Sequence, residues 1–140
     1  MRKLLLTLWL CLLPALAGAQ PVIPQTTASA AISVSTNGTV QLVAAPTLPG
    51  PGGTLQAIYV TNWNVIAGGT TNVQLVSGTG TNCGTGQANV TGNYPLTAQV
   101  GLVVGSGEGV VLAVPAGKAL CITTSGGSVA VAGSISYGVF

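Results

Sequence analysis

The sequence has almost no ionisable side chains. Charged residues make up 3% of its 140 residues, against roughly a quarter in an ordinary soluble domain. It contains no histidine, and Glu108 is its only acid. General acid–base catalysis needs a histidine or paired carboxylates, so we expect that the protein is not an enzyme. Lysine and arginine do not cluster outside the N-terminus, so we expect no nucleic-acid partner.

The sequence also lacks a motif for binding phosphate. Segment 105–109 reads Gly-Ser-Gly-Glu-Gly, which resembles a phosphate-binding loop superficially. Such a loop must lead into a helix, whereas the run Val-Val-Leu-Ala-Val that follows over 110–114 is typical of a strand. We therefore interpret 105–109 as a hairpin loop and expect no cofactor.

The N-terminal segment predicts export. Arg2 and Lys3 precede an apolar run over 4–16, and Ala-Gly-Ala at 17–19 fits a small-residue cleavage pattern. The run has about 13 residues, whereas a membrane-spanning helix needs roughly 20. We expect residues 1–19 to be a cleaved signal peptide and expect no transmembrane span. The chain would then be secreted, to the periplasm, the cell surface or the medium.

Two cysteines remain after such a cleavage. Cys11 lies in the signal segment, which leaves Cys83 and Cys121. An even pair in an exported chain indicates a disulfide. A reactive thiol would need a nearby cation, and Lys118 is the only base of the mature chain. A zinc site would need further cysteine or histidine ligands. We predict a structural Cys83–Cys121 disulfide and no metal site.

The mature chain predicts strands without helices. Two prolines and no periodicity over 20–30 indicate an extended leader, and residues 31–140 form one domain. Short β-branched runs alternate there with Gly, Pro and Asn, and their spacing favours an antiparallel β-sandwich or barrel. Asn37-Gly38 predicts a hairpin between the first two strands. The expected strands are 31–35, 40–44, 54–61, 72–77, 98–104, 110–114, 119–123 and 128–139.

Two segments are candidate ligand sites. Segment 76–87 is a Gly-rich loop, which we interpret as a surface loop pinned by Cys83 rather than as a ligand loop. Asn62, Trp63 and Asn64 together could bind a sugar, because an indole offers an apolar face and amides bond to hydroxyls. Tyr94 could extend that surface. The favoured interpretation is that Trp63 fills the core or a subunit interface, since the mature chain has few aromatic residues.

Several turns and strand ends resemble a known group of proteins. Segments 76–83, 94–97, 114–121 and 131–137, read in order, are similar to small jelly-roll proteins from the structural modules of tailed phages and prophages. In those proteins a closing Gly-x-Ile/Leu-x-Tyr strand follows a Pro-Ala-Gly turn. The resemblance covers about residues 54–140. It implies a jelly-roll sandwich with an oligomeric, non-enzymatic role in a virion or at a surface.

Together these observations predict an all-β, antiparallel sandwich of jelly-roll type with one disulfide. We expect an exported structural or interaction protein that associates with copies of itself or with a larger surface or virion assembly. We expect self-association because the chain has almost no charge, and charge repulsion keeps soluble domains apart. The alternative is a carbohydrate-binding module that uses Asn62, Trp63, Asn64 and Tyr94. We expect the protein to be secreted, and the alternative location is a virion.

Overall fold

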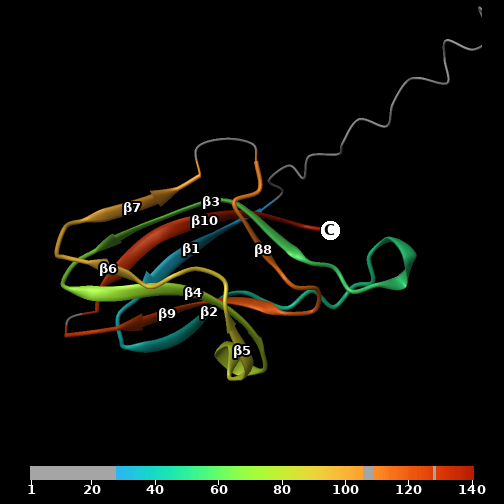
Figure 1. The fold of residues 1–140 in the computed structure, drawn as a ribbon, viewed down its shortest axis with the longest axis horizontal. Coiled ribbons are helices and arrows are strands. Elements are labelled where there is room, and N and C mark those ends of the chain that lie inside the picture. The colour runs from blue at the N-terminus through green and yellow to red at the C-terminus, as the bar shows by residue number, and fades with distance from the viewer. Residues whose placement is uncertain (1–27, 106–108, 128) are drawn as a thin grey trace, which may run out of the picture.

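The computed structural model describes residues 28–105, 109–127 and 129–140. Within these ranges the chain forms ten strands and no α-helix. The strands make two five-stranded antiparallel sheets that pack face to face (Figure 1). The predicted all-β sandwich is thus confirmed. The predicted signal peptide and most of the predicted leader lie outside the described residues.

Sheet A is the layer that holds the first and last described strands. It contains β1 (Ala28–Val34), β3 (Ile58–Ala67), β7 (Gly101–Val104), β8 (Leu112–Val114) and β10 (Val131–Val139). Its order is β1-β10-β3-β7, and β8 pairs with β3 beside β7. Because Ala28 lies opposite Tyr137, the start of β1 and the C-terminus lie at the same end of the sheet (Figure 1).

Sheet B is the second layer. It contains β2 (Gly38–Val43), β4 (Thr71–Thr79), β5 (Thr85–Asn89), β6 (Tyr94–Leu96) and β9 (Ala119–Ser125). Its order is β2-β9-β4-β5, and β6 pairs with β4 beside β5. Two short 3-10 turns complete the described elements, η2 (Pro51–Gly53) before β3 and η3 (Thr81–Cys83) between β4 and β5.

The strand order is that of a jelly roll. β5 and β6 line one edge of β4, and β7 and β8 line one edge of β3. With each of these interrupted pairs counted as one strand, the two sheets have the double Greek-key order of that fold. The predicted jelly-roll type is therefore confirmed.

Two predicted hairpins are wrong because neighbouring strands in the sequence do not pair with each other. Asn37 and Gly38 do form a turn, with Gly38 at φ +133°, but it carries the chain from sheet A into sheet B. Segment 105–109 lies between β7 and β8, which both pair with β3 instead of with each other. Glu108, in that segment, lies outside the described residues.

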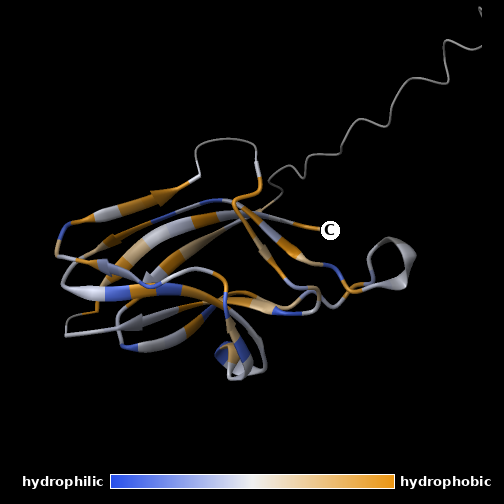
Figure 2. Ribbon diagram, in the orientation of Figure 1, coloured by the Kyte–Doolittle hydropathy of each residue, from blue (hydrophilic) through white to orange (hydrophobic). Residues whose placement is uncertain are grey.

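The main core lies between the sheets and is built by alternating residues. Along β9, Leu120, Ile122 and Thr124 face the core and are buried. Figure 2 shows hydrophobic positions interleaved with pale, weakly polar ones along the strands. The largest fully buried side chains are Trp63, Ile32, Ile58, Leu75, Leu120, Ile122 and Ile135.

A second, smaller cluster lies on the outer face of sheet B. Cys121 alternates with the inward Leu120 and Ile122, so its side chain points away from the main core. It forms a disulfide with Cys83, as predicted, with an Sγ–Sγ distance of 2.03 Å. The bond holds η3 against the sheet and buries Val76 and Ala119 beneath it. A loop that would otherwise be free is therefore part of the fold.

Candidate functional site

Trp63 lies in the core. Its side chain is 0% exposed, and its ring centroid lies 5.8 Å from that of Tyr94 at an interplanar angle of 60°. Trp63 belongs to sheet A and Tyr94 to sheet B, so the two rings join the layers across the interior. This position agrees with the favoured interpretation of the sequence, in which Trp63 fills the core.

A bulge in β3 sets the direction of the indole. The register of β3 with β10 shifts between Ser136 and Tyr137, which leaves Thr61 as the extra residue. Strict alternation from the buried Val60 would place Trp63 on the outer face of the sheet. The extra residue reverses the phase, so both Val60 and Trp63 are buried. The bulge thus turns an aromatic ring away from solvent.

Asn62 and Asn64 lie on the opposite side of the sheet from the indole. Both are half-buried, and their amides are used within the fold. Asn64 Nδ2 donates to Ser134 Oγ at 2.8 Å, and Asn62 Nδ2 donates to the Gly105 carbonyl at 3.2 Å. The four candidate sugar-binding residues are therefore divided by sheet A and present no common surface with an accessible ring.

The Trp63 indole nitrogen is the one buried side-chain polar atom without a partner among the described residues. An unsatisfied buried donor costs about 1–3 kcal/mol. Burying the large apolar ring offsets that cost. The nitrogen lies inside the packed interior, so it does not mark a surface site.

The described residues contain a single charged side chain and no cluster of metal ligands. Lys118 is the only charged side chain in the ranges 28–105, 109–127 and 129–140. The same ranges hold no group of three or more histidine, cysteine or acidic residues that could bind a metal. Cys83 and Cys121 are consumed in the disulfide. In this part of the chain, no helix has the length and apolarity to cross a bilayer.

The outer face of sheet A is uncharged and carries two exposed apolar side chains. Val103 is 70% exposed and Ile66 is 50% exposed. Val103 lies opposite Asn64, and Ile66 lies opposite Gly101, so the two apolar residues are diagonal neighbours on adjacent strands. At the other end of this face, the half-buried Tyr59 ring lies 6.1 Å from the ring of Phe140. The remaining positions named here carry small or amide side chains. They include Ser29, Ala31, Ser33, Asn62, Asn64, Ala132, Ser134 and Ser136.

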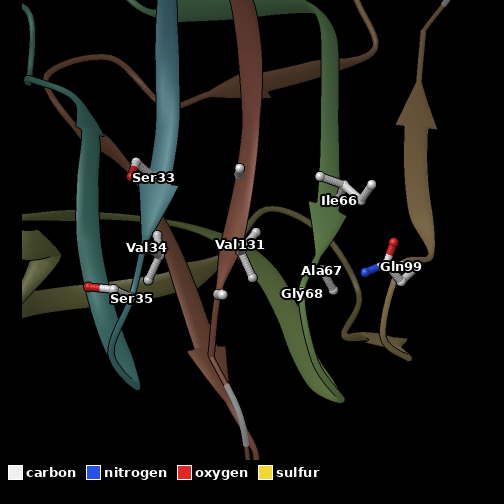
Figure 3. A pocket seen from close by; sticks show the side chains of 10 residues that line it. Ser33, Val34, Ser35, Ile66, Ala67, Gly68, Gln99 and Val131 are labelled. Carbon is white, nitrogen blue, oxygen red and sulfur yellow. The ribbon is translucent and has the colours of Figure 1, made fainter.

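A hollow of about 330 Å³ lies at one end of sheet A. Figure 3 shows it between the ends of β1, β10 and β3, with Gln99 at its side. Ser33, Ser35 and Gln99 give it hydroxyl and amide groups, and the remaining lining residues are glycine or aliphatic. The lining has no ionisable side chain, so its side chains offer a ligand hydroxyl, amide and aliphatic groups.

The sequence did not reveal this hollow, because its residues come from three strands and a loop that are distant in the chain. Gln99, beside the hollow, also has an unusual backbone conformation. It has φ +67°, unusual for a residue other than glycine, and its N–H donates to the Ala67 carbonyl at 2.7 Å. That conformation follows from tertiary packing and has no mark in the sequence.

The chain was compared with known proteins at three levels. No protein-family model, no curated protein and no solved structure matches it.

Proposed function

We propose that the protein is an exported, non-enzymatic structural protein that associates with copies of itself at a cell surface or in a virion. The observation that carries the proposal is the charge distribution: Lys118 is the only charged side chain among the described residues. Most soluble domains are kept apart by charge repulsion. Two copies of this surface approach each other without that repulsion.

The outer face of sheet A supports the same proposal. Along β1 and β10 its side chains are small, so they can pack flat against a neighbour. The exposed Ile66 and Val103 lose contact with water when covered. Contiguous exposed apolar surface in a soluble domain often marks an interaction site.

The disulfide supports export. Bonds such as Cys83–Cys121 persist in oxidising compartments and are rare in the cytosol. The signal-like segment over 1–19 agrees with this location. Virion association is the alternative assignment, and it is supported by the resemblance of segments 54–140 to phage structural proteins.

Glycan binding is not favoured as a second function. The candidate site would need the Trp63 ring at the surface for stacking, and Trp63 is fully buried. Binding to a glycan array that is lost in Asn64→Ala would revive that alternative.

Sedimentation velocity tests the proposal. The oxidised chain, purified after export, should show a weight-average mass that rises above the monomer with concentration. Because the association does not depend on ion pairs, it should persist from about 50 mM to about 500 mM salt. A monomer at every concentration overturns the proposal.

A further inference from the structure

Most edge strands of the described sandwich are protected against pairing with another chain. At the edge formed by β2, the register with β9 shifts between Gln41 and Val43. The side-chain oxygen of Asn82, held by η3, also accepts a hydrogen bond from the Gln41 N–H at 3.1 Å. A bulge together with a covering loop is a common way in which proteins block an edge.

Two further edges are interrupted. β5 and β6 contain five and three residues, and β6 includes Pro95, which cannot donate a backbone hydrogen bond. β7 and β8 contain four and three residues, and Gly105, directly after β7, has φ +92°. Short, broken strands offer a poor template to an incoming strand.

The edge formed by β1 has none of these protections. The strand is seven residues long, Ala-Ser-Ala-Ala-Ile-Ser-Val, with no proline, glycine or charged residue. Its register with β10 is continuous from Ala28, opposite Tyr137, to Val34, opposite Val131. Within the described ranges β10 is its only strand partner. A continuous, uncharged edge of this length presents a row of backbone donors and acceptors to another strand.

We propose that two copies of the chain pair antiparallel through β1, so that sheet A continues across a two-fold axis into the second copy. This inference rests on the self-association proposed above and names one contact for it, separate from the outer face of sheet A. A two-fold contact uses the same strand on both copies and leaves no β1 edge free.

The sequence of β1 is complementary to itself in the antiparallel direction. When the axis passes beside Ala31, the outward Ser29 lies opposite Ser33 of the second copy, so hydroxyl meets hydroxyl. On the inward face, Ala30 lies opposite Ile32 of the second copy, and Ala28 opposite Val34. Ala28 and Ala30 are half-buried in the single chain, so pairing completes their burial. This register matches polar with polar and apolar with apolar residues.

The absence of charge on β1 also favours a second copy as the partner. β1 has no ionisable side chain, so the same strand can approach itself without repulsion. Lys118 belongs to the turn before β9 in sheet B, not to the β1 edge.

Substitution of Ala31 tests the inference. Ala31→Lys places two ammonium groups side by side at the axis and should raise the dimer dissociation constant at least about tenfold. Ala31→Glu should do the same with two carboxylates. An equimolar mixture of the two variants should restore the dimer, because the ammonium group of one variant would then face the carboxylate of the other. The matched control is Ala88→Lys, an exposed alanine on β5 that should dimerise like the parent chain.

Hydrogen exchange gives a readout specific to backbone pairing. In the parent chain, the β1 amides should exchange more slowly as concentration rises, and in Ala31→Lys they should not. Dimers that persist in Ala31→Lys overturn the β1 contact but leave self-association standing. A monomeric parent chain overturns both proposals. Protection of β1 that does not depend on concentration means that another segment covers the edge, and it also overturns the β1 contact.

Discussion

Gly133 is a point where the backbones of β10 and β3 meet with no room for a side chain. A Cβ at this position would overlap the carbonyl oxygen of Asn64 and lie 2.9 Å from the Cα of Val65. Both atoms belong to the main chain of the facing strand, which pairs with β10 along its length. The strand cannot move aside without straining that pairing. Glycine is therefore required here for space.

Replacement of Gly133 by alanine should lower the free energy of unfolding by about 1–3 kcal/mol, the usual cost of overpacking. The neighbouring Ala132→Ser is the matched control, because Ala132 is exposed and lies on the outer face. Urea unfolding followed by tryptophan fluorescence measures both variants. An unchanged midpoint for Gly133→Ala would show that the strands separate easily.

The geometry of the candidate site also depends on single residues. The few aromatic residues of the chain favoured a core position for Trp63, and that interpretation agrees with the structure. The bulge at Thr61, which determines the direction of the ring, depends on the partner strand and not on the local sequence. The predicted strand ended at 61, whereas β3 continues to Ala67, so the alternation that places Asn62 and Asn64 opposite the ring was not expected.

At the scale of elements, the strands found from sequence are those with apolar residues in alternation. β9 begins at the expected residue 119 and ends two residues beyond the expected 123. β10 begins three residues after the expected 128 and ends at the expected 139. β5 was missed because all of its residues are exposed and polar or small. β6 was missed because it is short and contains Pro95. β1 begins at Ala28, ahead of the expected start at 31.

The pairing of strands is harder to predict than the strands themselves. Asn37-Gly38 has the composition of a hairpin turn, but β1 pairs with β10 from the far end of the chain. The side chain of Asn37 instead donates to the Gly126 carbonyl at 2.8 Å, which joins two turns between the sheets. Such a long-range choice depends on burying the inner face of each sheet against the other, which local turn chemistry does not encode.

The η3 loop should lose its position when the disulfide is removed. The bond joins residues separated by 38 positions, and a loop of this length corresponds to about 4 kcal/mol of stabilisation in the chain-entropy model. The double variant Cys83→Ala, Cys121→Ala should therefore unfold at a lower denaturant concentration. A thiol reductant should destabilise the parent chain and leave the variant unchanged. Equal stability of the two proteins would contradict a structural role for the bond.

At the scale of the whole molecule, the shortage of ionisable groups predicts stability that is insensitive to pH. The slope of unfolding free energy against pH is set by the difference in bound protons between the unfolded and folded states. The chain has no histidine, and its disulfide cysteines do not titrate. That difference should be close to zero between about pH 5 and pH 8.

Thermal unfolding at several pH values checks this expectation. The midpoint should vary by no more than about 2 °C across that interval, because a change of 1 kcal/mol shifts it by roughly 4 °C in a domain of this size. A steep slope would reveal a titrating group whose environment changes on folding.

The start of β1 and the C-terminal Phe140 share one end of sheet A, and the hollow beside Ser33 and Ile66 lies at the other. A purification tag fused after Phe140 would therefore sit remote from the hollow. A chain captured on a biosensor chip through such a tag would present the hollow to the flowing solution, ready for a screen of neutral small molecules.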